Sequence, residues 1–112
     1  MQMLDFNAIE QPTWEVKLRN LDQVLHLSAP NEALIERLGA MEKDIANAQK
    51  KKDGRIARGL YTVLAEVMSH NEDFLTITAE DLRDKYRFTL ADAFKFYFGY
   101  MAFMKEIEEA KN

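Results

Sequence analysis

The closing stretch, residues 89–110, carries more apolar side chains than one face of a helix can hold. Of the seven Phe and four Tyr in the chain, six lie between positions 94 and 103. Thr89 with Asp92 three positions later has the spacing of a capping box, which predicts that a helix begins here. At about 100° per residue, the helix shows two apolar stripes that together cover roughly 220° of its circumference. A surface helix usually needs only about 100°.

The two stripes face different directions. The first consists of Leu90, Phe94, Tyr97, Met101 and Met104. The second consists of Phe96, Tyr100, Phe103 and Ile107. In one interpretation this is the central helix of the core, and other elements cover both stripes. In the other, the second stripe is partly exposed and binds an apolar helix of a partner. We therefore take its four residues as candidate partner-binding residues.

The rest of the chain predicts a mainly helical α+β fold in a single domain over residues 1–112. Residues 1–13 are expected to form an extended lead-in anchored by Leu4, Phe6 and Ile9. Residues 14–28 alternate between apolar and polar side chains, which predicts a β-hairpin. Its apolar face consists of Trp14, Val16, Leu18, Leu25 and Leu27. A lone hairpin is marginally stable in water, so this face must pack on helices.

Residues 30–110 are expected to form a bundle of about four helices. After Pro30, a first helix keeps apolar spacing through Leu34, Ile35, Leu38, Met41 and Ile45. A second has Ile56, Leu60, Val63, Leu64, Val67 and Met68 facing inward and ends near Asn71. Thr78 with Asp81 predicts a short third helix. The helix rich in aromatic residues is the fourth.

No residue pattern indicates catalysis. Cysteine is absent, which excludes a disulfide framework, a thiolate nucleophile and a cysteine metal site. The two histidines, His26 and His70, belong to different elements and lack the spacing of a metal-binding helix, so we expect structural or solvent-facing roles. The four glycines stand apart and form no phosphate-binding loop. We therefore expect no enzyme activity, no catalytic residue, no metal and no cofactor.

Charge argues against nucleic acid as a partner. The net charge is −4, whereas binding to phosphates needs clustered Lys and Arg. A basic cluster at Lys50, Lys51, Lys52, Arg55 and Arg58 could hold a phosphate or an acidic partner, although a solvated turn between helices is the simpler interpretation. No apolar run is long enough to cross a membrane, and the first residues lack the pattern of a signal peptide, so we expect no membrane partner.

Three stretches together resemble the small tail assembly chaperones of long-tailed phages and prophages of Gram-positive bacteria. They read LDFNAIEQPTWEVKL, VLHLSAPNEALIERL and TAEDLRDKYRFTLADAFKFYFGYMAFMKEIEEAKN, and the order of these pieces extends the likeness over nearly the whole chain. The resemblance implies a non-catalytic protein that binds the hydrophobic, helical tape measure protein and helps the tail tube protein polymerise around it. It also implies a location in the cytoplasm of the bacterial host and absence from the mature virion.

Other functions remain open at this stage. A self-associating structural subunit would use the second stripe of the last helix as the seam between copies. A small DNA-binding regulator would place its recognition helix at residues 90–110, but that segment offers aromatic side chains where base and phosphate contacts need polar and basic ones. The size of the protein measured over a dilution series separates the structural subunit from the chaperone, because a stable oligomer with no affinity for the tape measure protein would favour the subunit.

Overall fold

The N-terminal part forms the predicted antiparallel hairpin in this computed structural model, which describes residues 3–5, 11–51 and 54–110. Strand β1 (Thr13–Val16) pairs with β2 (Leu25–Ser28), so that Trp14 lies opposite Leu27. Each strand is only four residues long, and the paired region is therefore shorter than the alternation over 14–28 suggested. Leu27 is fully buried, as that alternation predicted.

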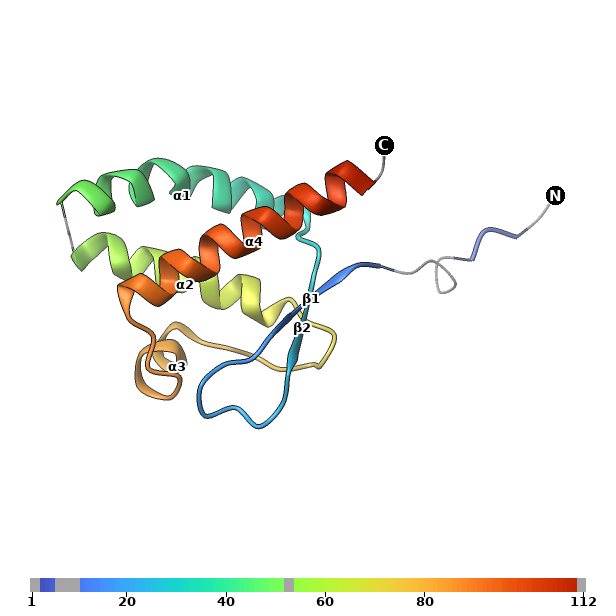
Figure 1. Ribbon diagram of the computed structural model, residues 1–112, viewed down its shortest axis with the longest axis horizontal. Helices are drawn as coiled ribbons and strands as arrows, with labels where there is room; N and C mark the ends of the chain where they lie inside the picture. Colours follow the sequence, from blue (N-terminus) through green and yellow to red (C-terminus); the bar gives the residue numbers. More distant parts are fainter. Residues whose placement is uncertain (1–2, 6–10, 52–53, 111–112) are drawn as a thin grey trace.

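Four helices follow the hairpin and confirm the mainly helical α+β fold class. They are α1 (Glu32–Lys51), α2 (Gly54–Ser69), α3 (Ala79–Asp84) and α4 (Leu90–Ala110). In Figure 1, α4 crosses in front of α2, and α1 runs along the top of the view. The short helix α3 lies at the lower left, below the start of α4. In the described part of the chain, no helix is long and apolar enough to cross a membrane.

The centre of the core is α2, since it packs against α1, α3, α4 and β2. Its inward face is almost completely shielded from water, and three of its leucine and methionine side chains are fully buried: Leu60, Leu64 and Met68. Val67 is also fully buried and Val63 is half-buried, as the apolar spacing predicted, whereas the side chain of Ile56 lies outside the described part of the structure. The last helix, which has the larger aromatic content, lies on one side of α2 and does not occupy the centre.

Two capping boxes start the last two helices, as the sequence predicted. The Thr78 hydroxyl accepts a hydrogen bond from the Asp81 amide at 3.0 Å, and the Asp81 carboxylate accepts one from the Thr78 amide at 3.3 Å. Thr89 and Asp92 make the same reciprocal pair at 3.1 and 2.9 Å. Each box satisfies amides that would otherwise lack a partner in the first turn.

The tip of the hairpin is tied to the beginning of α4. Arg19 donates two hydrogen bonds to the Asp92 carboxylate, at 2.8 and 3.1 Å. These bonds, together with the Thr89 amide, hold the pKa of Asp92 well below its ordinary value of 3.8. Asn20, which has a positive φ of 62°, donates from its side-chain amide to the Lys85 carbonyl at 2.9 Å. The hairpin is thus fixed to the C-terminal half at its tip as well as along its strands.

The loop after α2 presents an exposed aromatic side chain on a rigid frame. The Asn71 amide oxygen accepts from the backbone amides of Asp73 and Leu75, and its nitrogen donates to the carbonyls of Met68 and Leu75. Phe74 between them is 96% exposed and has a φ of 58°. A bulky L-residue pays about 1–2 kcal/mol for that left-handed conformation. The surrounding bonds impose a backbone geometry that a glycine would adopt without strain.

The expected anchors of the lead-in are not confirmed. Leu4 is 70% exposed and Met3 is more so, which means that neither contributes to the core. The expectation for Leu4 is therefore wrong, because the apolar face of the hairpin begins at Trp14 and is already covered by α4. Phe6 and Ile9 lie outside the residues that the structure describes.

Candidate functional site

The second stripe of α4 lies mostly in the core, so the predicted exposure is wrong for three of its four residues: Phe96, Tyr100 and Phe103. The indole of Trp14 covers them, with ring centroids 5.5 Å from Phe96 and 6.2 Å from both Tyr100 and Phe103. Tyr100 is fully buried and donates its hydroxyl to the Ser28 carbonyl at 3.1 Å, and burial raises its pKa. The hairpin therefore occupies the surface that a partner was expected to use.

The exposed apolar surface of α4 lies along the first stripe and its edge. Phe98 is 51% exposed, and Met101 and Met104 are half-buried. Across from them on α1, Ile35 is 50% exposed. The surplus of apolar side chains in α4 is real, but the part left uncovered faces α1.

These side chains line two adjacent hollows between α1 and α4, which we call together the α1–α4 groove. Its wider section and its end section share Ile35 and Met104. The wider section, of about 570 Å³, is lined by Ile35, Leu38, Gly39, Glu42, Ile45, Ala46, Tyr97, Phe98, Met101 and Met104. The end section is lined by Ala29, Pro30, Ile35, Met104, Ile107 and Glu108. Ile107 is thus the one residue of the second stripe that reaches this surface.

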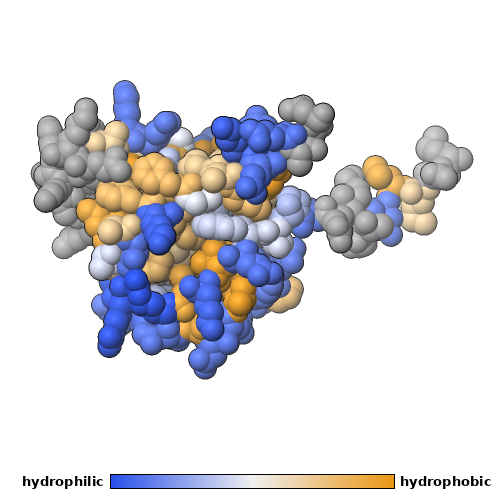
Figure 2. Space-filling model, viewed as in Figure 1, coloured by the Kyte–Doolittle hydropathy of each residue, from blue (hydrophilic) through white to orange (hydrophobic). Residues whose placement is uncertain are grey.

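Small residues on α1 leave the groove open. The two helices run antiparallel, since Ile35 near the start of α1 meets the C-terminal part of α4. Gly39 and Ala46 stand where larger side chains would fill the space, and a Cβ added at Gly39 would have no neighbour within 4 Å. In Figure 2, apolar residues gather in a band over the neighbouring parts of α1 and α4. Tyr97, which is buried, forms part of the floor.

The charged groups in the lining are both acidic. Glu42 lies in the wider section and Glu108 in the end section. Glu42 and Tyr97 line the same section; burial raises the pKa of Tyr97, and the Glu42 carboxylate contributes to the rise. Among the described residues, neither glutamate forms an ion pair with a Lys or Arg. The groove is therefore apolar with negative charge at two points.

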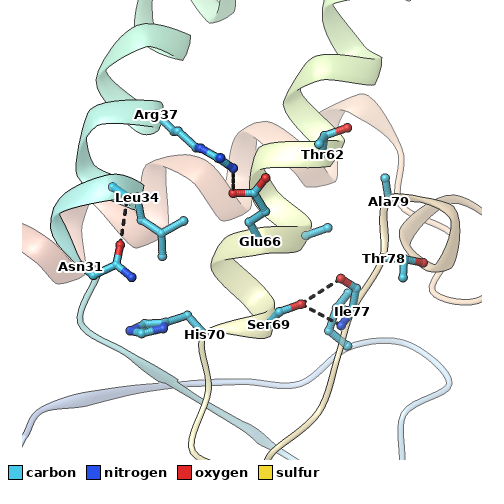
Figure 3. A pocket seen from close by; sticks show the side chains of 12 residues that line it. Asn31, Leu34, Arg37, Thr62, Glu66, Ser69, His70, Ile77, Thr78 and Ala79 are labelled. Atoms are coloured by element: carbon cyan, nitrogen blue, oxygen red, sulfur yellow. Dashed lines mark hydrogen bonds and ion pairs between the residues drawn. The ribbon is translucent and has the colours of Figure 1, made fainter.

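A second, more polar pocket lies between α1, α2 and the segment leading into α3 (Figure 3). Its polar groups are largely engaged with one another. Arg37 pairs with Glu66, and the Ser69 hydroxyl both donates to and accepts from the backbone of Ile77 at 2.9 Å. The side chain of Asn31 accepts from the Leu34 amide at 2.9 Å and caps α1. The Arg37–Glu66 pair joins α1 to α2, and the Ser69 bonds join α2 to the segment before α3, so these polar groups already have partners within the protein.

The two histidines have different surroundings. His26 lies with its Nδ1 3.1 Å from Asp73 and its Nε2 3.8 Å from Glu15. Asp73 also accepts the His26 backbone amide at 2.7 Å, and this bond is the main reason that the pKa of Asp73 is lowered. The contact joins β2 to the loop after α2. His70, half-buried at the end of α2, lies at one end of the polar pocket near Asn31 (Figure 3).

Two further sequence-based expectations concern metal ions and phosphate. In the ranges 3–5, 11–51 and 54–110, no three His, Asp or Glu side chains come together as a metal site would require. The basic cluster Lys50, Lys51, Lys52, Arg55 and Arg58 falls where side chains lie outside the described part of the structure.

The sequence did not single out Phe98 or Ile35. Phe98 belongs to neither stripe of α4, and Ile35 matches the apolar spacing of α1 that predicted burial. A signal was nevertheless present, because the face of α1 that contains Ile35 continues through Gly39 and Ala46, which are too small to cover a neighbouring helix. Comparison with protein families, curated proteins and solved structures finds no match for the chain. Function is therefore inferred from the residues and their arrangement.

Proposed function

We propose that this chain is a non-enzymatic tail assembly chaperone of a long-tailed phage or prophage, and that it binds the tape measure protein through the α1–α4 groove. The observation that carries the proposal is the exposed apolar lining of this groove, centred on Phe98 and Ile35. Contiguous apolar surface on a small protein usually marks a partner site. The resemblance of the three sequence stretches to tail assembly chaperones supplies the identity of the partner.

The shape of the groove suits a helical partner. Its lining on α1 runs from Ile35 to Ala46, which corresponds to about 17 Å or three helical turns. A helix laid between α1 and α4 would place side chains at i, i+3 or i+4, and i+7 against this lining. Met101 and Met104 have flexible thioether side chains that adapt to different apolar sequences. This property fits a chaperone that covers many segments of one long helical protein.

The experiment is co-purification with the tape measure protein that this proposal predicts as the partner. Phe98→Asp and Ile35→Asp, alone and together, should abolish co-purification, because each puts a charge into the apolar lining. Phe74→Asp is the matched control, since it makes the same change at a more exposed phenylalanine outside the groove. Circular dichroism should show that the three groove variants and the control keep the helical fold. Unchanged capture by the groove variants would refute the proposal.

The rival function is a self-associating structural subunit. Its specific support is the edge of β1, because in the described part of the chain β1 pairs with β2 alone. A row of free backbone groups at such an edge can pair with the same strand of another copy. Sedimentation over a dilution series distinguishes the two functions. A stable oligomer without affinity for the tape measure protein would favour the rival.

A further inference from the structure

We propose that the α1–α4 groove selects an amphipathic helix whose apolar face is flanked by Lys or Arg. The inference rests on the proposed function for the place of binding and adds the chemistry of the partner segment. It is carried by the juxtaposition of an open apolar lining with Glu42 and Glu108. A bound helix would bury its apolar side chains on Ile35, Phe98 and Met101 and bring its flanks to the two carboxylates.

Glu108 is placed where a cation is especially favourable. It belongs to the last turn of α4, in which Glu106, Glu108 and Glu109 follow one another closely and no basic residue is present. The exposed carbonyls at a helix C-terminus carry partial negative charge, so acidic side chains there are destabilising. Lys105 approaches Glu109 at 4.0 Å, and Glu108 forms no ion pair with a Lys or Arg among the described residues. A Lys or Arg from a partner would offset both the carboxylate and the helix dipole.

Glu42 supplies the second point of recognition. It lies in the lining itself, close enough to Tyr97 to affect the titration of its hydroxyl group. Charge at the edge of an apolar contact contributes more to specificity than to affinity. A helix with acidic flanks would meet repulsion at Glu42 and again at Glu108. The groove thus discriminates between helices of equal hydrophobicity by the sign of their flanking charge.

Other occupants fit this charge pattern less well. The lead-in at residues 1–13 has apolar side chains, but its charged side chains are those of Asp5 and Glu10, both acidic. A second copy of the chain carries a net charge of −4. Like charges facing each other reduce affinity, so a basic partner segment is the better complement.

The test uses labelled synthetic peptides of about 16 residues, which span the groove as a helix. One carries Leu at helical spacing with Lys on both flanks, a second has Glu in place of each Lys, and a third contains the residues of the first in an order without an apolar face. Fluorescence anisotropy is measured during titration with the whole protein. We expect the Lys peptide to bind about tenfold more tightly than the Glu peptide at low salt, with the difference shrinking as salt rises. The shuffled peptide should not bind.

Substitutions in the protein test whether Glu42 and Glu108 cause the preference for the Lys peptide. The double variant Glu42→Gln and Glu108→Gln should remove the preference for Lys while both peptides still bind. The matched control Glu72→Gln and Glu80→Gln removes two exposed carboxylates elsewhere and should keep the preference. Phe98→Asp should abolish binding of every peptide. A preference that survives the Glu42 and Glu108 substitutions would overturn the inference, as would equal binding of the two amphipathic peptides or binding of neither.

Failure of this inference can be distinguished from failure of the proposed function. If the Lys peptide binds selectively but the tape measure protein does not, the groove has the proposed chemistry and the identity of the partner is wrong. If the tape measure protein binds through Phe98 without any charge preference, only the inference fails. If the protein is a dimer that Phe98→Asp converts to a monomer, the occupant is a second copy and the inference is overturned.

Discussion

Replacing Gly99 with alanine should destabilise the protein relative to the same replacement at Gly39. Both glycines lie inside helices, where alanine is favoured over glycine by about 1 kcal/mol. Their surroundings differ. A Cβ at Gly39 would meet no atom within 4 Å, whereas a Cβ at Gly99 would lie 2.7 Å from Cη2 and 2.9 Å from Cζ2 of Trp14. Contacts that short require the indole or α4 to move.

The indole has little room to yield, because it is held against Phe96 and Phe103. Added volume in a well-packed site typically costs about 1–3 kcal/mol. Gly39→Ala should therefore raise the free energy of unfolding by about 0.5–1 kcal/mol. Gly99→Ala gains the same helix preference but also incurs the steric cost. Its free energy of unfolding should therefore be unchanged or fall by up to about 2 kcal/mol. The two variants should differ by about 1–3 kcal/mol.

Urea denaturation followed by circular dichroism measures this difference. The fluorescence of Trp14, the single tryptophan, reports the same transition in chains that retain it. In a Trp14→Leu background the ring is gone, so Gly99→Ala should become stabilising by about the same amount as Gly39→Ala. The reasoning is refuted if Gly99→Ala stabilises the original chain as much as Gly39→Ala does, since that result would mean that Trp14 does not rest on α4 at this point.

Four further substitutions test other features of the fold. Tyr100→Phe removes the hydroxyl bound to the Ser28 carbonyl and should cost about 0.5–1.5 kcal/mol in urea denaturation, and an unchanged midpoint would contradict that bond. Phe74→Gly relieves about 1–2 kcal/mol of backbone strain against about 0.5–1 kcal/mol for the freer unfolded chain, so the melting temperature should rise slightly, whereas a fall would show that the ring is supported. Because the pKa of Asp92 is lowered in the folded protein, its contribution to stability is complete above about pH 4 and is lost as the pH falls towards the folded pKa. Asp92→Asn should flatten that acid dependence, and Arg19→Gln should do the same. A pH profile identical to that of the original chain would exclude the interaction.

Local features of the fold could be predicted because they depend on neighbouring residues. The boxes at Thr78 and Thr89 form as their spacing indicated, since each needs only a side chain and an amide three positions away. The alternating hairpin residues also predicted burial of Leu25 and Leu27 correctly. These elements obey short-range rules that hold in any fold.

The location of the exposed surface could not be predicted in the same way. The two stripes of α4 are similarly apolar. Which of them is covered depends on where Trp14 packs in the folded chain. Likewise, Ile35 has the spacing of an inward residue, but α1 turns Leu34 and Leu38 towards the core and leaves Ile35 at the edge. Packing between segments far apart in the sequence decides which side of each helix is buried. The residue pattern of a single helix contains no information about that packing.

The dependence of the hairpin on α4 has a consequence for how the chain acquires its structure during synthesis. The bond from Tyr100 to Ser28 spans 72 positions, and that from Arg19 to Asp92 spans 73. A growing polypeptide therefore exposes Trp14 and its neighbours until the aromatic segment leaves the ribosome, because nothing made earlier can shield that side of the hairpin. Closing so long a loop carries an entropic cost that precedes the gain from ring packing. The hairpin is thus translated early, but its apolar face is covered only after α4 has been made. A chain truncated before α4 should therefore be prone to aggregation.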